Sequence, residues 1–544
     1  MIMDGTAANT ATFLLENADL DAPAWIEHGR TWTYRDVHAA AADIAARLRG
    51  RRLRPGTPVG LYAGNGLFWI AAYLAVFAEG LVAVPLATTL GADEAVRRAV
   101  WAGCRVLACG RTQRSGLARL ADAAGLSVLG EPDAFPARHE PDPIDTRGLP
   151  EPADVGGLPA AADAASARLH PVPVDQDADA AYLFTSGTTG TPRAVRITHA
   201  NLRANTESIL AYLPLTAADR TLVVLPFSYV FGASLLHTHL RAGAALAHQA
   251  SAAYPETVVD SLADLQCTGF AGVPAVFHAL VRNSTFTTRS LPALHIVQQA
   301  GGALAPAVAD ELVQAHPQAQ LFVMYGQTEA TARLSYLPPA ERTARRGSIG
   351  RGIPGVQLRV VDAGGHDVRP GQIGEIIARG RNISPGYLRD PEASARKMGD
   401  GVLRTGDLAT VDDDGYIYVV DRVEDFIKSW GHRVASTDVE AAAMELAEVV
   451  SAVAVGVPDE LAGERIELVA VLRDGSQLDE QTVLAHCRRR LPRHMVPTRV
   501  RLVAELPLNA NGKVLKRAVR ELCLVPGPSG AAVTALDVSA VGGS

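Results

Sequence analysis

The chain has 544 residues, of which 48% are hydrophobic and 20% are charged. This length exceeds what one hydrophobic core organises, so we expect two or more domains in an ordinary globular enzyme. The formal net charge of −7 argues against a nucleic-acid-binding protein, because no basic surface or stripe of Lys and Arg with aromatics is present.

The cysteines and the apolar runs indicate the compartment. The five cysteines are scattered and form no metal-ligand pairs, so we expect small buried thiols in a reducing compartment. They are Cys104, Cys109, Cys267, Cys487 and Cys523. The N-terminus lacks a signal-peptide pattern, and the longest apolar run, Phe68 to Ala78, is too short to cross a bilayer. We predict a cytoplasmic protein in which this run is a buried helix.

Helix and strand patterns alternate over the first 130 residues. The stretch Thr33–Asp36 predicts the capped start of an Ala-rich helix that runs to Leu48, and Pro58–Tyr62 predicts a buried strand. Such alternation favours an α/β sheet with helices on its faces. Residues 131–180 are rich in Pro, Ala, Asp and Gly, and predict an irregular connection with at most a short helix.

The alternation resumes from Ala181 to about Arg379. Strand patterns occupy Thr221–Val224, Leu294–Val297 and Leu321–Met324. These residues therefore extend the α/β architecture of the first part of the chain.

A compact pattern restarts after Asp421–Glu424. It includes a predicted helix at Ser436–Leu446 and a predicted strand at Val450–Val455. We predict a large N-terminal domain over residues 1–423, a small α+β domain over residues 424–526 and a disordered tail over residues 527–544.

The most informative motif follows a strand pattern at Tyr182. Residues 182–195 read YLFTSGTTGTPRAV, in which glycines and Ser or Thr hydroxyls alternate closely. Such a loop can bring backbone N–H groups and hydroxyls to a polyphosphate. It differs from the common P-loop, because Pro192 stands where the helix would begin and no Lys follows. Taken alone, a surface turn is an equally good interpretation.

Five further motifs follow in order over more than half of the chain. They are Gln299–Ala303, Met324–Ala330, Arg404–Asp407, Asp421–Lys428 with Gly431–Arg433, and Pro507–Lys513. Together with the loop after Tyr182, this series resembles the adenylate-forming superfamily of acyl-CoA synthetases, peptide-synthetase adenylation domains and beetle luciferase. The resemblance implies an α/β fold, with mixed sheets covered by helices in the large domain and a small mobile C-terminal α+β domain.

The resemblance implies a two-step reaction. A carboxylic acid and ATP give acyl-AMP and pyrophosphate with Mg²⁺ present, and CoA then takes the acyl group. The implied phosphate-binding residues are Thr185, Ser186, Gly187, Thr188, Thr189, Gly190 and Arg193. The chain departs from the family at Arg193, which is usually Lys, and at Ala194, which is usually Gly; Arg keeps the charge and can bind phosphate oxygens.

The nucleotide residues come from three later motifs. The resemblance assigns Thr328 to the α-phosphate, Glu329 to Mg²⁺ and Tyr325 with Gly326 to the adenine. Asp407, expected at a strand edge, accepts from the ribose hydroxyls to which Arg422 also donates. The backbone beside the adenine and the acyl group is formed by Gly301, Gly302 and Ala303, and Arg433 completes the nucleotide set.

The C-terminal motifs imply domain rotation. Lys513 bridges the carboxylate and the α-phosphate during adenylation in the family, although an exposed loop Lys is usually inert. Glu424 corresponds to the hinge, and rotation brings Lys428 and Gly431 near the incoming pantetheine.

Trp430 is unexpected, because the family places a small or flexible residue beside the pantetheine tunnel. Its large rigid ring could obstruct the pantetheine arm, or turn outward and pack against the other domain.

The acyl-binding segment Leu225–Leu240 contains no Asp or Glu, which disfavours an α-amino acid substrate. Tyr229, Phe231, Gly232 and Val273, with Gly301 and Gly326, predict an apolar pocket for a fatty, aryl or polycyclic acid. The acceptor of the acyl group is CoA or an acyl carrier protein. The sequence leaves open whether the protein forms a homodimer. Two alternatives remain: an adenylation specialist that hands acyl-AMP to a carrier or partner ligase, and a non-catalytic nucleotide- or acyl-binding homologue.

Overall fold

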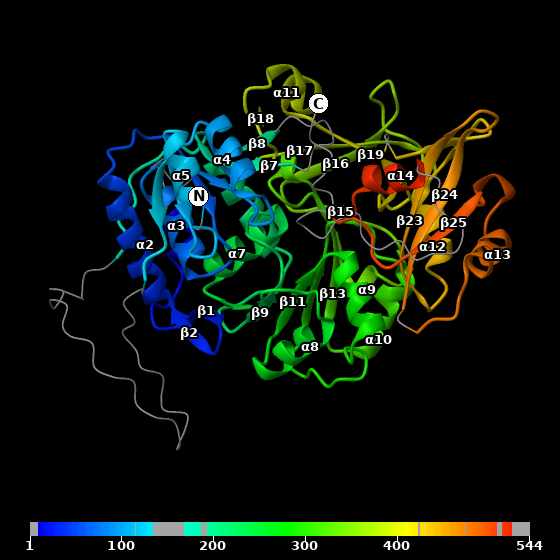
Figure 1. The fold of residues 1–544 in the computed structure, drawn as a ribbon, viewed down its shortest axis with the longest axis horizontal. Coiled ribbons are helices and arrows are strands. Elements are labelled where there is room, and N and C mark those ends of the chain that lie inside the picture. Colours follow the sequence, from blue (N-terminus) through cyan, green and yellow to red (C-terminus); the bar gives the residue numbers. More distant parts are fainter. Residues whose placement is uncertain are drawn as a thin grey trace.

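The strands of the residues described below form four sheets (Figure 1). The computed structural model describes residues 9–114, 116–133, 168–185, 193–422, 425–473, 475–508 and 514–524. Among these residues, no sheet combines strands from before and after residues 423–424. Most of the predicted irregular connection and the predicted disordered tail lie outside the described residues, and residues 168–178 contain no helix.

The largest sheet has nine strands. Its order is β15 (Arg351–Gly352), β14 (Ser335–Leu337), β13 (Gln320–Tyr325), β12 (Ile296–Gln299), β11 (Gly269–Gly272), β9 (Arg220–Val223), β10 (Ala245–His248), β1 (Pro23–Glu27) and β2 (Arg30–Thr33). The predicted strands at Thr221 and Leu321 are confirmed. The strand predicted from Leu294 begins at Ile296 instead, because Leu294 still belongs to a turn in which its N–H donates to Leu291.

The second sheet has seven strands and carries the glycine-rich loop. Its order is β18 (Gly386–Tyr387), β8 (Ala194–Thr198), β7 (Asp179–Phe184), β4 (Val82–Pro85), β3 (Pro58–Tyr62), β5 (Val106–Cys109) and β6 (Ser127–Gly130). Strands β7 and β8 are antiparallel, with Phe184 opposite Ala194, and Thr185 N–H donates to Arg193 O at 3.0 Å. The loop therefore starts and ends on two paired strands.

Helices cover these two sheets. They are α1 (Thr10–Leu15), α2 (Tyr34–Arg49), α3 (Leu67–Ala78), α4 (Ala92–Trp101), α5 (Leu117–Ala123), α6 (His199–Leu210), α7 (Val230–Ala242), α8 (Pro255–Asp264), α9 (Pro274–Asn283), α10 (Pro306–Ala315) and α11 (Pro391–Met398). The predicted capped start of α2 is confirmed, and Thr33 and Asp36 form a capping box there. Every residue of α3 is buried, which confirms the buried helix and stabilises the core by about 1.5–3 kcal/mol for each large apolar side chain.

A third sheet positions the Arg404–Asp407 motif. Its order is β16 (Val356–Val361), β17 (Gly374–Gly380), β19 (Leu403–Val411) and β20 (Ile417–Arg422). Asp407 lies within β19, between β17 and β20, and its register partner is Arg422. The prediction that Asp407 lies at a strand edge is therefore wrong: every second residue from Leu403 to Ala409 is buried, and the strand extends past the motif on both sides.

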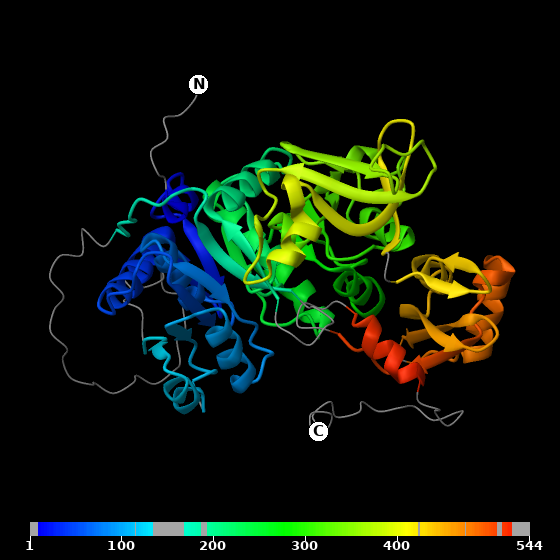
Figure 2. The ribbon, with the colours of Figure 1, turned by 90° about the horizontal axis from the view of Figure 1, so that it is seen from above.

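The fourth sheet belongs to the small C-terminal part, which lies beside the rest of the molecule in Figure 2. Its strands are β22 (His432–Val434), β21 (Ile427–Ser429), β24 (Gly463–Leu472), β23 (Val449–Asp459) and β25 (Arg499–Val503), with helices α12 (Ser436–Ala443), α13 (Glu480–Arg490) and α14 (Lys516–Leu524). Helix α12 ends before the predicted Leu446, which belongs to a turn. All five cysteines are buried, as predicted.

Candidate active site

The nucleotide motifs converge on Asp407. The hydroxyl of Tyr325, at the end of β13, donates to Asp407 Oδ2 at 2.5 Å, and Arg422 Nε donates to Asp407 Oδ1 at 3.0 Å. Three separately predicted residues from two sheets therefore form one group. Both carboxylate oxygens already have a donor, so Asp407 is held in a fixed orientation.

Burial differs within this group. The side chain of Asp407 is 6% exposed, whereas that of Arg422 is 50% exposed. Burial and the Asp407 carboxylate raise the pKa of Tyr325 well above its usual value, so the phenol stays a hydrogen-bond donor. The half-exposed guanidinium of Arg422 is the part of the group that solvent or a ligand can reach.

Glycine is required at two predicted positions. A Cβ on Gly326 would lie 1.8 Å from Ala332 O, which is a backbone atom and cannot move aside like a side chain. Gly301 has φ +92° and its Cβ would lie 3.0 Å from the Tyr229 hydroxyl. Gly302 and Ala303 follow in an exposed turn. A side chain at Gly326 or Gly301 would therefore overlap neighbouring protein atoms.

Glu329 belongs to a second group, on the short 3-10 helix η1 (Thr328–Ala330). Its Oε1 accepts from the Tyr387 hydroxyl at 2.6 Å, and the Arg193 guanidinium lies 5.0 Å from the centre of the Tyr387 ring. Arg193 also lies 3.7 Å from Asp390. The last residue of the glycine-rich loop is thus connected through Tyr387 to the predicted metal ligand.

Sequence reasoning missed Tyr387, which is on β18 at the edge of the seven-stranded sheet. Burial, followed by the Glu329 carboxylate, raises the pKa of Tyr387, so its hydroxyl holds one oxygen of Glu329. A tyrosine in the turn-forming run Ser384-Pro385-Gly386-Tyr387 was the available signal.

The predicted acyl residues form one apolar cluster. Tyr229 is the N-cap of α7, and its ring meets that of Phe231 edge-on at 6.5 Å. Val273 belongs to the same cluster, and its Cγ1 would lie 2.9 Å from a Cβ on Gly301. Gly232 is required because a Cβ there would lie 2.2 Å from Pro226 O. The structure therefore brings these predicted residues together.

Arg333 is the unexpected member of this region. It is 2% exposed, and its Cζ lies 4.2 Å from the centre of the Phe231 ring. Neither composition nor the motifs drew attention to it, although it is a lone charge in the run Ala332-Arg-Leu-Ser-Tyr-Leu337.

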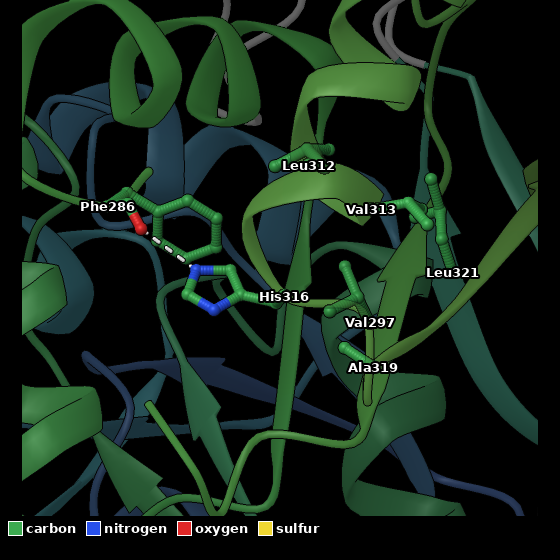
Figure 3. Close-up of a pocket in the computed structure, with 7 residues that line it drawn as sticks. All are labelled: Phe286, Val297, Leu312, Val313, His316, Ala319 and Leu321. Carbon is green, nitrogen blue, oxygen red and sulfur yellow. Dashed lines mark hydrogen bonds between the residues drawn. The ribbon is translucent and has the colours of Figure 1, made fainter. Parts of the chain in front are cut away.

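A small apolar hollow lies on the other face of the nine-stranded sheet, beside α10 (Figure 3). Its lining includes Leu321, whereas the acyl cluster includes Phe322 and Met324 from the same strand. Successive strand residues point to opposite faces. His316 Nε2 hydrogen-bonds to Phe286 O at 2.8 Å at the edge of the hollow. None of its lining residues belongs to the predicted site.

The segment that the sequence predicts for thioester formation lies on the small C-terminal part. Lys428 and Arg433 are exposed and opposite each other on β21 and β22. Trp430 and Gly431 form the turn between them, with φ +53° and +78°. Trp430 is 64% exposed. In the part of the chain that the structure describes, no hydrogen bond or ion pair joins Lys428 or Arg433 to the Asp407 group.

Several predicted residues lie outside the described residues. They are Ser186, Gly187, Thr188, Thr189, Gly190, Glu424 and Lys513. Their neighbours are described: Leu508 and Val514 form an antiparallel bridge on either side of the Lys513 segment.

Comparison with known proteins identifies the family. The sequence profile of AMP-binding enzymes matches residues 15–388, and that of the AMP-binding enzyme C-terminal domain matches residues 438–513. The chain belongs to the AMP-binding enzyme family. It is 31% identical to a feruloyl-CoA synthase of Amycolatopsis over 91% of this chain and 95% of the relative. It is 29% identical to an oxalate–CoA ligase of Arabidopsis thaliana over 94% and 98%.

The fold agrees with this assignment. The crystal structure of ATP-bound MatB from Rhodopseudomonas palustris aligns with a TM-score of 0.81 and 27% identity, over 95% of this chain and 99% of that one. These matches confirm the predicted fold and the predicted class of AMP-forming acid–thiol ligases. In the described part of the chain, every helix is too short or too polar to cross a bilayer.

Proposed function

We propose that this protein converts a small carboxylic acid and ATP to acyl-AMP and pyrophosphate, and then transfers the acyl group to CoA. The observation that carries the proposal is the group formed by Tyr325, Asp407 and Arg422 beside Gly326. It combines a carboxylate held by two donors with an exposed guanidinium, which suit the hydroxyls of a ribose.

ATP would bind across the three sheets of the large part. In this proposal Thr185–Gly190 and Arg193 bind the β- and γ-phosphates, and Thr328 binds the α-phosphate. Gly301, Gly302, Ala303 and Tyr325 lie against the adenine, while Asp407, Arg422 and Arg433 complete the nucleotide site. The half-buried positions of Arg193 and Thr328 leave them accessible to phosphate oxygens.

Glu329 is the proposed Mg²⁺ ligand. Mg²⁺ typically takes one or two carboxylates together with phosphate oxygens and waters, so one fixed glutamate fits. The Tyr387 hydroxyl occupies Oε1 and orients the group. Bound there, Mg²⁺ would neutralise phosphate charge as pyrophosphate leaves.

Two domains would perform the two steps. We keep the boundary at residues 423–424 and the hinge at Glu424, which is consistent with the absence of a shared sheet across these residues in the described part of the chain. Lys513 would act in adenylation, and Lys428, Trp430 and Gly431 would approach the pantetheine after rotation.

The relatives leave the acid open. One is named for feruloyl-CoA and another for oxalate, which are an aryl acid and a dicarboxylic acid. The acyl cluster around Tyr229, Phe231, Gly232 and Val273 would bind the organic part of the substrate.

A second function is favoured by Trp430. A bulky residue in the left-handed region is strained, and here it projects from a hairpin turn next to Gly431. If this ring blocks the pantetheine arm, the enzyme would be an adenylation specialist that passes acyl-AMP to an acyl carrier protein or a partner ligase.

One assay separates these functions. The protein is mixed with ATP, Mg²⁺, CoA and a panel of carboxylic acids, and acyl-AMP and acyl-CoA are quantified separately by mass spectrometry. Acyl-CoA at the rate of ATP use supports the ligase. Accumulated acyl-AMP that Trp430→Gly converts to acyl-CoA supports the specialist, and ATP binding without pyrophosphate exchange would contradict both.

A further inference from the structure

Arg333 is a buried cation that has no counter-ion among the residues that the structure describes. Its Nε donates to Met324 Sδ at 3.3 Å, which is a weak acceptor, and Nη2 is buried without a hydrogen-bond partner. Among the described residues, no carboxylate lies within ion-pair distance of it.

The surroundings only partly compensate this charge. Phe231 offers the face of its ring at 4.2 Å, and Met324 Sδ also accepts from the Tyr212 hydroxyl at 3.2 Å. A buried guanidinium normally has a carboxylate, a phosphate or several carbonyl acceptors. Burial also lowers the pKa of Arg333 from its usual value, although the neighbouring Tyr212 and Tyr229 oppose this effect.

The position of Arg333 indicates what the missing partner is. It contacts Phe231, whose ring neighbours Tyr229, and Tyr229 in turn reaches Gly301. Tyr229 and Gly301 are only half-buried, so this cluster reaches solvent on the side where the acyl group is expected. Arg333 therefore lies against the cluster of residues that are predicted to bind the acyl group.

We propose that Arg333 binds a second carboxylate on the substrate, so that the preferred substrates are dicarboxylic acids. This inference rests on the proposed function, because it assigns the acyl site of that reaction. The guanidinium donates to the distal carboxylate, while the first carboxylate attacks the α-phosphate of ATP and pyrophosphate leaves. The pocket, which the sequence predicts to be apolar, would then carry one positive charge at the end that receives the distal carboxylate.

The test compares charged and uncharged forms of the same acids. Succinate, glutarate, adipate and terephthalate are each assayed against their monomethyl esters, with acyl-AMP and pyrophosphate as readouts. For the best diacid we expect kcat/KM about 100-fold above that of its monoester. In Arg333→Met we expect the diacid to lose about 100-fold, mainly through KM, and the monoester to change less than about threefold.

Arg351→Met is the matched control, because Arg351 also lies over an aromatic ring, Tyr416, at 4.5 Å, but is exposed. It should leave the diacid preference unchanged. Arg333→Met should keep or raise the melting temperature, because it replaces a buried unpaired charge with an apolar side chain of similar volume. A large fall in melting temperature with an unchanged diacid preference would make Arg333 a structural residue.

Calorimetric titration of the same diacids separates this inference from the proposed function. If monoesters form acyl-AMP as well as diacids do, the Arg333 assignment fails and the ligase function stands. If no acid supports pyrophosphate release, the function fails, while diacid binding that Arg333→Met abolishes still supports the assignment. Equal binding by both proteins overturns it.

Discussion

The two sides of the candidate active site differ in how their charges are compensated. On the nucleotide side, Asp407 has two donors and Glu329 has one, all from the protein itself. On the acyl side, Arg333 is buried with an unpartnered nitrogen. A site for an invariant, highly charged ligand can be fixed in advance, whereas selection among acids requires a group that only the right acid satisfies.

The largest expected effect comes from Gly326→Ala, which tests how tightly the nucleotide side is built. Its Cβ would overlap Ala332 O at 1.8 Å, and displacing backbone should cost about 3 kcal/mol or more. Thermal unfolding and ATP titration measure the loss. Gly399→Ala is the control, since nothing lies within 4 Å of its Cβ; equal behaviour of both variants would contradict a close-packed nucleotide side.

Asp407→Asn should have the next largest effect. It removes the charge that orients Tyr325 and Arg422, and we expect ATP binding to weaken about 10- to 100-fold, since hydrogen bonds to charged groups contribute about 1.5–3 kcal/mol. The fold should change little because Arg422 is half-exposed to solvent. Tyr325→Phe, which removes one donor, should cost only about fivefold. An unaltered ATP affinity in Asp407→Asn would show that this group does not hold the nucleotide.

Glu329→Gln tests whether Glu329 binds the metal on the nucleotide side. We expect the Mg²⁺ concentration for half-maximal acyl-AMP formation to rise about tenfold, because the amide is a poorer ligand for a hard cation. Tyr387→Phe keeps the Glu329 carboxylate and removes one hydrogen bond to it. We therefore expect the half-maximal Mg²⁺ concentration to rise about fivefold or less. A Mg²⁺ requirement that neither variant alters would place the metal elsewhere.

The smallest expected effect concerns pH. Burial and neighbouring carboxylates raise the pKa of Tyr325 and Tyr387 above their usual value of 10.0. Because the pKa is raised, these hydroxyls stay protonated, and their hydrogen bonds stay formed, until the pH exceeds the raised pKa. ATP affinity should therefore be constant between about pH 7 and 9. A midpoint below pH 9 that Tyr325→Phe removes would show that Tyr325 titrates within this range.

The sequence predicted the nucleotide side far better than the acyl side, for physical reasons. The predictions of α2, from its cap at Thr33 and Asp36, and of α3, from the apolar run to Ala78, depend only on local sequence patterns. Both helices are confirmed. The residues Tyr325, Asp407 and Arg422 belong to motifs, so their roles could be assigned before any contact was known. The central position of Asp407 in β19 depends on β17 and β20, which local patterns do not reveal.

Tyr387 and Arg333 were not predicted, because their importance depends on which residues lie next to them in the folded chain. Tyr387 matters through Glu329, which is 58 residues away in the chain. Arg333 matters because no acid in the described part of the chain pairs with it, and the absence of a partner is visible only after folding.

The most direct test of the contrast between the two sides is calorimetric titration of the intact protein, Asp407→Asn and Arg333→Met with ATP and with glutarate or terephthalate. We expect Asp407→Asn to weaken ATP binding and to leave diacid binding within about threefold. We expect Arg333→Met to weaken diacid binding and to leave ATP binding within about threefold. Loss of ATP affinity in Arg333→Met equal to that in Asp407→Asn would contradict this expectation.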